Sequence, residues 1–268
     1  KWSVNKANEV KLYYTIDTEY LCSTPDYKGV NPDKTTADIM TTVRKIGYSE
    51  LWKNHLADYQ RLFNRVEFDL TGDKELEQLP TDQRIMQLKK GITDDSKLKA
   101  LWFNFGRYMI ISASRANTLP SNLQGVWNAA ERAAWNGNYQ SNINLQEMYW
   151  SCGATRLEEC EMAYINWIKG LVPSGRKTAK AYYGTQGWVS NATGDIWGYT
   201  CPGSDILWGL YPCGAAWHCR HLWEHYEYTQ DKAYLKEVYP IMKEAAQFWL
   251  EKIVKKEGYL MVIPSISA

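Results

Sequence analysis

The sequence has no marked excess of charge and no long apolar run. Its 31 basic and 30 acidic side chains leave a formal net charge of +1. That balance gives no electrostatic reason to expect a nucleic acid or an anionic membrane surface as a partner. No apolar run approaches the roughly 20 residues that a membrane span requires. We therefore expect a neutral ligand and no membrane-spanning segment.

The six cysteines include no C-x-x-C pair, and the spacing of Cys213 and Cys219 matches no recognised metal site. Neither a zinc ribbon nor a thioredoxin-like redox site is therefore indicated. We expect small buried hydrophobes, with room for one disulfide. The sequence also lacks a fixed-period repeat, which argues against a solenoid.

Phenylalanine is scarce, with five residues beside 13 Trp and 19 Tyr. Trp and Tyr combine a large ring with a polar group, so they suit surfaces where an apolar face meets a hydrogen-bonding partner. Sugars, nucleic acid bases and polar helix surfaces all qualify as partners. The charge balance disfavours the bases.

The chain opens with a β pattern and continues with helical patterns. Residues 10–20 alternate and are rich in β-branched and aromatic side chains, which predicts a strand, and residues 66–70 predict a second, shorter one. Helix-start signals stand at 80–82 and 94–96. Three- and four-residue spacings predict helices at 35–44, 48–64, 98–114, 145–170, 178–183, 214–228 and 232–255, with loops at 170–176, 184–187 and 194–209. Helices joined by long loops suggest a helical toroid around a cleft.

A loop at 118–128, continued at 135–144, is dense in amides and indoles and poor in charge. Amides donate to and accept from hydroxyl groups, and indole faces cover the apolar faces of pyranose rings. A neutral sugar is one interpretation. An ordinary turn-rich loop is the other, because Asn and Gly are common in turns.

Within this stretch, Asn142 and Asn144 are two residues apart. In an extended segment such residues point to the same side, so both carboxamides would face one point of the cleft. Two amides can position a water molecule or a carboxylate, although neither takes a proton at neutral pH. We interpret them as residues that assist the reaction by positioning another group.

Asp195 stands between indoles in the loop at 187–198. It could bind sugar hydroxyls, act as an acid or base, or cap a turn, and capping is the commonest role of such an Asp. His221 and His225 form an H-x-x-E-H pattern with Glu224, which formally matches inverted zinc peptidases. That five-residue match is weakly specific, and no distant acidic ligand can be identified, so a zinc hydrolase is the minor alternative.

Read together, these segments resemble glycoside hydrolase family 95. The similarity runs in order through nearly the whole chain, which makes chance unlikely. It covers residues 55–60, 62–66, 79–84, 105–108, 112–115, 119–127, 142–144, 149–150, 187–189, 195–197, 214–217 and 221–226.

The resemblance implies a mainly α fold. Residues 1–21 would be the end of an N-terminal β-sandwich, residues 22–78 a linker with helices, and residues 79–268 the N-terminal part of an (α/α)6 catalytic barrel. It implies an inverting exo-glycosidase that hydrolyses terminal α-L-fucosyl or α-L-galactosyl residues of oligosaccharides, without a cofactor. A bacterial protein of the periplasm or the extracellular space is expected.

The resemblance also assigns roles to residues. Asn142 and Asn144 would activate the water, while Gln140, Asp195, Trp217 and Trp127 would bind the substrate. No evident pair of carboxyl groups stands within the sequence, although glycoside hydrolysis needs two carboxyl groups or one with a positioned substitute. The segment from Pro264 matches the opening of the motif that ends in the family's general acid, so the acid and base are expected beyond residue 268 and the chain to be part of a longer protein.

The sequence departs from the family's pattern at three places: Glu147-Met148, residues 191–195, and Gln140, which stands where the family can present a His. The loss of His near the sugar weakens the expectation of fucose in particular and keeps L-galactose open. A carbohydrate-binding relative that has lost catalysis is a further alternative.

Overall fold

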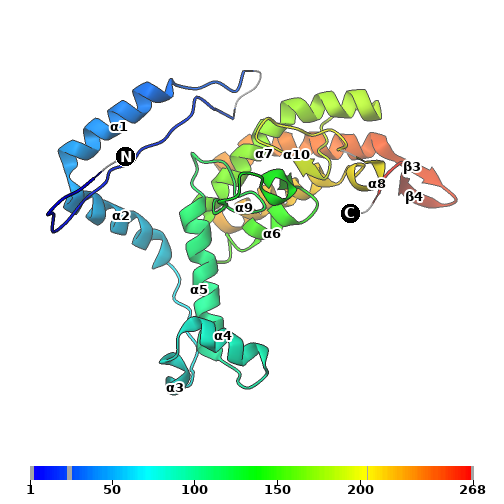
Figure 1. The fold of residues 1–268 in the computed structure, drawn as a ribbon. Helices are drawn as coiled ribbons and strands as arrows, with labels where there is room; N and C mark the ends of the chain where they lie inside the picture. The colour runs from blue at the N-terminus through cyan, green and yellow to red at the C-terminus, as the bar shows by residue number, and fades with distance from the viewer. Residues whose placement is uncertain (1–2, 23–25, 204, 267–268) are drawn as a thin grey trace. The chain divides into compact units, whose positions relative to one another are not determined.

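The computed structural model describes residues 3–22, 26–203 and 205–266 (Figure 1). Lys1 and Trp2 of the expected sandwich segment, and Ser267 and Ala268 of the expected acid motif, lie outside the described residues. The chain divides into two compact units, residues 1–60 and 61–268, and each is described by itself. The fold is mainly helical, as the sequence predicts. None of the described helices is both long and apolar enough to pass through a membrane.

The first unit contains α1 (Pro32–Ile46) and most of α2 (Tyr48–Phe63). The side chain of Asn31 accepts from the Asp33 amide, and Pro32 provides the first turn with a fixed φ, so α1 begins three residues before the predicted start at Thr35. Gly47, with φ of 78°, ends it. Both predicted helices of this unit are confirmed, each with small differences at its ends.

The strand expected at 10–20 does not form. Its backbone has no strand partner in the described part of the unit, apart from the isolated bridge between Tyr20 and Lys28. A strand is defined by the neighbour that it pairs with, so the alternating pattern alone cannot produce one. Whether residues 1–21 end a β-sandwich stays a prediction.

The second unit starts with the end of α2 and includes α3 (Lys74–Glu77), α4 (Thr81–Lys89) and the long α5 (Ser96–Ala113) (Figure 1). The strand expected at 66–70 is also absent. Side chains of α5 instead donate to two carbonyls of this segment, those of Val66 and Phe68. The guanidinium of Arg107 donates to the carbonyls of Leu62, Phe63 and Val66, and the Asn104 amide donates to that of Phe68.

Asp95 connects α4 to the start of α5. Its side chain caps α5 through the Leu98 amide and makes two hydrogen bonds of 2.8 Å to the guanidinium of Arg84. Both side chains are buried. The helix-start signal at 94–96 is therefore confirmed, and Asp95 adds a tertiary contact that the signal does not reveal.

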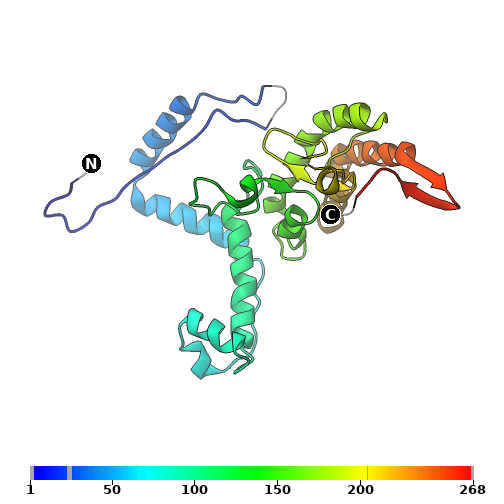
Figure 2. The same ribbon diagram turned by 45° about the vertical axis from the view of Figure 1, so that its right-hand side comes forward.

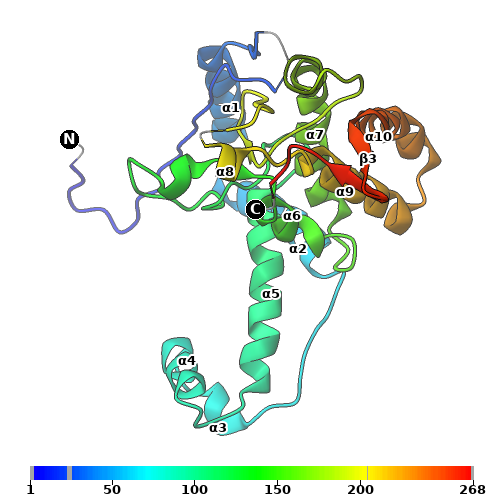
Figure 3. The same ribbon diagram turned by 90° about the vertical axis from the view of Figure 1, so that its right-hand side faces the viewer.

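The core of the second unit is formed by α7 (Glu158–Thr178), α9 (Gly214–Thr229) and α10 (Lys232–Lys252), which Figures 1 and 3 show beside one another. The helix expected at 145–170 is wrong in its middle, because turns at 151–156 separate α6 (Asn144–Trp150) from α7. Arg156 has a φ of 58°, which a helix interior does not allow.

The loop expected at 170–176 is also wrong, since α7 continues through Pro173 and Gly175. Gly175 is a packing position. A Cβ there would lie 2.8 Å from the Trp188 ring and 2.9 Å from the Val189 carbonyl oxygen. The glycine allows the segment at Trp188 and Val189 to approach α7 closely. In the sequence alone, a glycine required for packing cannot be told from a glycine in a loop.

After α7, the π-helical turn η2 (Ala179–Tyr183) and the short α8 (Ile206–Gly209) lead to α9. Past α10 the expected helix turns into a hairpin of β3 (Ile253–Lys256) and β4 (Tyr259–Val262), visible in Figure 2. Glu257 and Gly258 both have positive φ, as a two-residue hairpin turn requires. All six cysteines are free thiols, and Cys152 and Cys160 are fully buried.

Candidate functional site

A short two-stranded ladder organises the region that the sequence singles out. Strand β1 (Tyr139–Gln140) pairs antiparallel with β2 (Thr193–Gly194), Tyr139 opposite Gly194 and Gln140 opposite Thr193. Beyond it, the Ser141 amide donates to the Ala192 carbonyl at 2.6 Å. The ladder therefore brings two predicted segments, one with Gln140 and the other leading to Asp195, into direct contact.

Asn142 and Asn144 follow this ladder but are not in an extended segment. Residues 141–143 form a turn, and Asn144 is the first residue of α6. The expectation that two-residue spacing points both amides to one side is therefore wrong in its reasoning, because that rule holds for extended backbone only. Asn144 is exposed, and Asn142 is half-buried with its Oδ1 shielded from solvent and without a protein donor.

Gln146 stabilises the turn that carries Asn142. This side chain is fully buried on α6, and its Nε2 donates to the Ser141 carbonyl at 2.6 Å. The Oγ of Ser141 and the Oε1 of Gln146 are buried acceptors without a protein donor, like Oδ1 of Asn142. Three such oxygens within six residues of chain give this turn the capacity to accept hydrogen bonds from a hydroxyl-bearing ligand or from water.

Tyr149 ties the amide-rich loop at 118–128 to α6. Its hydroxyl accepts from the Ser121 amide at 2.8 Å and lies 2.7 Å from Oγ of Ser114. Burial raises the pKa of Tyr149, so the hydroxyl stays protonated and able to donate. On the same loop the Leu123 amide donates to the Asn138 carbonyl, next to β1. Trp127 lies on the same loop, with its side chain 46% exposed.

Asp195 directly follows β2 and serves as a turn cap. Its Oδ1 accepts from the backbone amides of Trp197 and Tyr199, at 2.8 and 3.0 Å. The capping interpretation holds for this oxygen. Its carbonyl accepts from the indole of Trp167 on α7, which anchors the loop to the core. Sugar binding by Asp195 stays a prediction, as it does for Gln140, whose Nε2 donates to Oδ1 of Asn138.

Trp217 lies half-buried on α9, and no hydrogen bond or ring contact described here joins its side chain to the ladder. The next residue, His218, does reach this region. Its Nδ1 lies 2.6 Å from the Tyr164 hydroxyl, and its ring packs edge-on against Trp167. Burial, with His221 nearby, lowers the pKa of His218 to about 3, so its imidazole is neutral at any ordinary pH.

The structure gives His221 and His225 a structural role. Both imidazoles are buried on α9 and turn their Nδ1 atoms to the carboxylate of Glu161, at 3.4 and 3.0 Å. Glu224, the acid of the zinc motif, instead pairs with exposed Arg220. Within the described ranges no group of three or more His, Cys, Asp or Glu side chains is placed to hold a metal.

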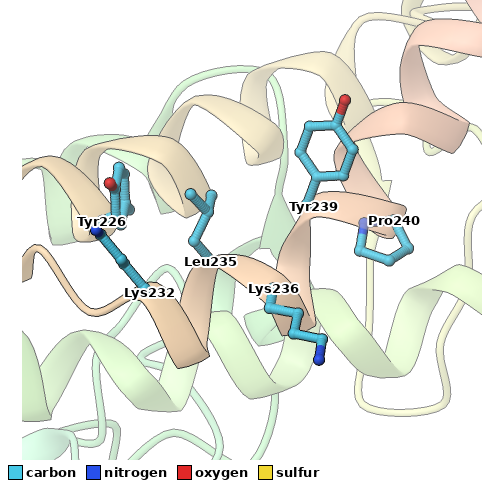
Figure 4. A pocket seen from close by; sticks show the side chains of 6 residues that line it. All are labelled: Tyr226, Lys232, Leu235, Lys236, Tyr239 and Pro240. Carbon is cyan, nitrogen blue, oxygen red and sulfur yellow. The ribbon is translucent and has the colours of Figure 1, made fainter.

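Figure 4 shows a groove at the end of α9 and the first half of α10. It is lined by Tyr226, Lys232, Leu235, Lys236, Tyr239 and Pro240. The lining is mostly apolar, with lysines at the edge, and includes none of the predicted site residues. The ladder and its loops are therefore the better candidate site.

Known proteins of one family resemble this chain over most of its length. The pattern of the glycosyl hydrolase family 95 catalytic domain matches residues 47–268. The chain belongs to glycosyl hydrolase family 95. Alpha-L-fucosidase 2 of Arabidopsis thaliana is 38% identical over 277 residues, which cover 100% of this chain and 32% of that protein. Probable alpha-fucosidase A of Aspergillus niger is 36% identical over 269 residues, covering 96% of this chain and 34% of that protein.

The chain thus spans about a third of the length of the curated family 95 relatives it matches. The relatives named here come from a plant and a fungus, so they lend no support to the expectation of a bacterial source. Sequence reasoning from the family missed the residues that hold the site together, Gln146, Tyr164 and Trp167. Tyr149 stood within a matched motif, but no role was assigned to it.

Proposed function

We propose that the protein containing this chain is an inverting exo-glycosidase that removes terminal α-L-fucosyl residues, or α-L-galactosyl residues, from oligosaccharides. Family 95 membership and the names of the two relatives, both alpha-fucosidases, support the fucosyl assignment. The observation that carries the proposal is the ladder that joins the turn with Asn142 to the loop of Asp195, in a region rich in neutral amides. Such a region suits a ligand that carries hydroxyl groups and no charge.

In this proposal Asn142 and Asn144 hold the attacking water, and Gln140, Asp195, Trp217 and Trp127 contact the sugar. An amide oxygen accepts a hydrogen bond from the water and orients one of its lone pairs toward the anomeric carbon, but only a carboxylate can take the proton that the water loses. Inversion requires room for the water, so the two carboxyl groups would stand about 6.5 to 9.5 Å apart. We assign both to the part of the family 95 relatives that this chain does not cover.

We further propose that the helices of residues 79–268 belong to an (α/α)6 toroid and that residues 1–21 end a β-sandwich. A periplasmic or extracellular location would give such an enzyme access to oligosaccharides. The proposed reaction needs no cofactor, because water, an acid and a base suffice for hydrolysis.

The test is to incubate the intact protein with α-L-fucosyl fluoride and α-L-galactosyl fluoride and to follow the product by proton NMR. The expected first product is the β anomer of the free sugar. Release of the α anomer would overturn the inverting mechanism. Binding of sugar without turnover would instead identify a carbohydrate-binding relative.

The role of the two amides is tested in the same assay. Asn144→Gly should lower kcat much more than it raises KM, because positioning of water acts in the transition state. Asn128→Gly is the matched control, since Asn128 is exposed in the neighbouring loop and its amide donates to the Ala130 carbonyl. Equal changes in kcat and KM for Asn144→Gly would make it a binding residue only.

A further inference from the structure

Two tryptophans that no role has been assigned to stand exposed beside the candidate site. The side chain of Trp135 is 75% exposed and that of Trp197 is 56% exposed. An exposed indole lacks the stabilisation that burial gives a large apolar side chain. Scattered exposed residues need no explanation, but these two occur on loops that leave the ladder at the same end.

The register of the ladder brings them together. Because Tyr139 is opposite Gly194, the residues before 139 and those after 194 leave the ladder at the same end. Trp135 precedes the ladder by four residues and Trp197 follows it by three. Asn142 lies beyond the other end, and the ladder between them is only about 7 Å long, at roughly 3.4 Å per residue.

Both loops are held in place by hydrogen bonds. The carbonyl of Ala134 accepts from Nε2 of Gln124, and the Asn138 amide donates to the Trp135 carbonyl. The Trp197 amide is capped by Asp195. The exposed indoles therefore project from ordered backbone, as a binding surface requires.

The backbone at Trp135 is strained. Trp135 and Asn136 have φ of 54° and 57°, a left-handed conformation that is unfavourable for residues with a Cβ. Consecutive residues of this kind are retained where the surroundings enforce them, and they concentrate at ligand-binding sites. Here the strained turn presents an indole to solvent instead of burying it.

We propose that Trp135 and Trp197 form a second sugar-binding surface, which takes the part of the oligosaccharide beyond the terminal sugar that is cleaved. This inference rests on the proposed function. Indole faces stack on the apolar faces of pyranose rings, and the neighbouring amides of Asn136 and Asn138 meet the hydroxyl groups. Residues 133–138 carry no ionisable side chain, so a neutral saccharide suits them better than a charged group.

The experiment compares two substrates of the intact protein. Fucosyl fluoride carries one sugar and reports on the terminal site, whereas a fucosyllactose trisaccharide also reaches the second surface. Trp135→Ala and Trp197→Ala should each raise KM for fucosyllactose about tenfold or more, and this increase should be at least about fivefold larger than the change for fucosyl fluoride, because loss of the ring removes apolar contact with the sugar. Trp135→Tyr should recover much of the loss, because it restores a flat ring. Trp102→Ala is the matched control, since Trp102 is 73% exposed on α5.

The outcomes separate this inference from the proposed function. If the wild-type protein turns over neither substrate, the proposed function fails. If it turns over both and the Trp135 and Trp197 variants affect the two substrates equally, the second surface is overturned. Either variant is expected to fold, because truncating an exposed side chain removes little packing.

A second measurement needs no substitution. Hydroxyl-radical footprinting of the wild-type protein, read by mass spectrometry, should show oxidation of Trp135, Trp197 and Trp102 in buffer. Saturating lactose, the product left after removal of fucose from fucosyllactose, should protect Trp135 and Trp197 and leave Trp102 reactive. Equal oxidation of all three with and without lactose would overturn the proposal.

Discussion

The side-chain amide of Gln146 donates a hydrogen bond of 2.6 Å to the backbone carbonyl of Ser141. This contact joins the first turn of α6 to the turn that carries Asn142. Gln146 is fully buried, so the bond is shielded from water and cannot be replaced by a solvent molecule without rearrangement. It makes Gln146 a positioning residue for the amide assigned to the water.

Gln146→Met should therefore lower kcat on fucosyl fluoride about tenfold or more while KM changes little. The side chain keeps its approximate volume and loses its donor, so Asn142 is placed less accurately. The unpaired Ser141 carbonyl should also reduce the free energy of unfolding by about 1 to 3 kcal/mol. Steady-state kinetics and urea unfolding measure the two effects. A loss of stability with unchanged kcat would leave Gln146 a purely structural residue.

The zinc alternative leads to a different test on Glu161. Its carboxylate accepts from both His221 and His225 in the core, so Glu161→Leu should lower the free energy of unfolding by about 3 kcal/mol or more. Glu227→Leu, at an exposed position of α9, should change it by about 0.5 kcal/mol at most. Elemental analysis of the wild-type protein should find no stoichiometric zinc, and a chelator should leave hydrolysis intact. Stoichiometric zinc that is lost together with activity would contradict this assignment.

The pair of Arg84 and Asp95 predicts how stability changes with pH. The Arg84 guanidinium holds the pKa of the Asp95 carboxyl below its usual range, despite burial that acts in the opposite direction. In the unfolded chain this carboxyl titrates near about 3.9. The folded state therefore binds fewer protons, and the stabilisation is fully present above that pH and is lost as the pH falls through the lower folded pKa.

Asp95→Asn should accordingly reduce the free energy of unfolding at neutral pH by about 3 kcal/mol, and it should remove part of the acid sensitivity of the wild type. Asp94→Asn is the matched control, because Asp94 is the neighbouring residue and pairs with Lys99 at the surface. Urea unfolding at pH 7 and at about pH 3 provides both values. If the two variants lose stability equally at neutral pH, the buried pair does not dominate.

Much of the helical fold follows from local signals in the sequence. The helix-start signal at 94–96 is confirmed by the Asp95 cap of α5, and α10 begins at Lys232 as predicted, with Asp231 as its cap. The predictions of secondary structure that are wrong fail where contacts between segments distant in the sequence determine the backbone. Gly175 resembles a loop residue but permits Trp188 to approach α7. Residues 66–70 resemble a strand, but two of their carbonyls accept from side chains of α5.

The sequence predicts which segments form the candidate site but not how these segments contact one another. Amide and indole content, together with the family resemblance, selects the segments around Asn142 and Asp195. Their contact depends on the pairing of Gln140 with Thr193, more than fifty positions apart, and short ladders of this kind leave little periodic signal. Gln146 could not be recognised either, because its role is a bond to a backbone carbonyl that any residue type at position 141 would offer.

Gly184 and Gly187, which precede Trp188, allow the effect of backbone conformation to be measured apart from the effect of steric space, because both have positive φ but only one is closely packed. Gly184 and Gly187 have φ of 65° and 75°, so alanine at either position incurs the left-handed penalty of about 1 kcal/mol. Nothing lies within 4 Å of a Cβ at Gly184, whereas at Gly187 it would collide with the Glu244 carbonyl oxygen and come within 2.8 Å of the Phe248 nitrogen. Since these atoms belong to the backbone of α10, they cannot move aside as a flexible side chain would.

Gly187→Ala should therefore lower the free energy of unfolding by about 3 kcal/mol or more and Gly184→Ala by about 1 kcal/mol. Urea unfolding of both variants measures the difference, and equal losses would show that the packing of this segment against α10 is not as close as described.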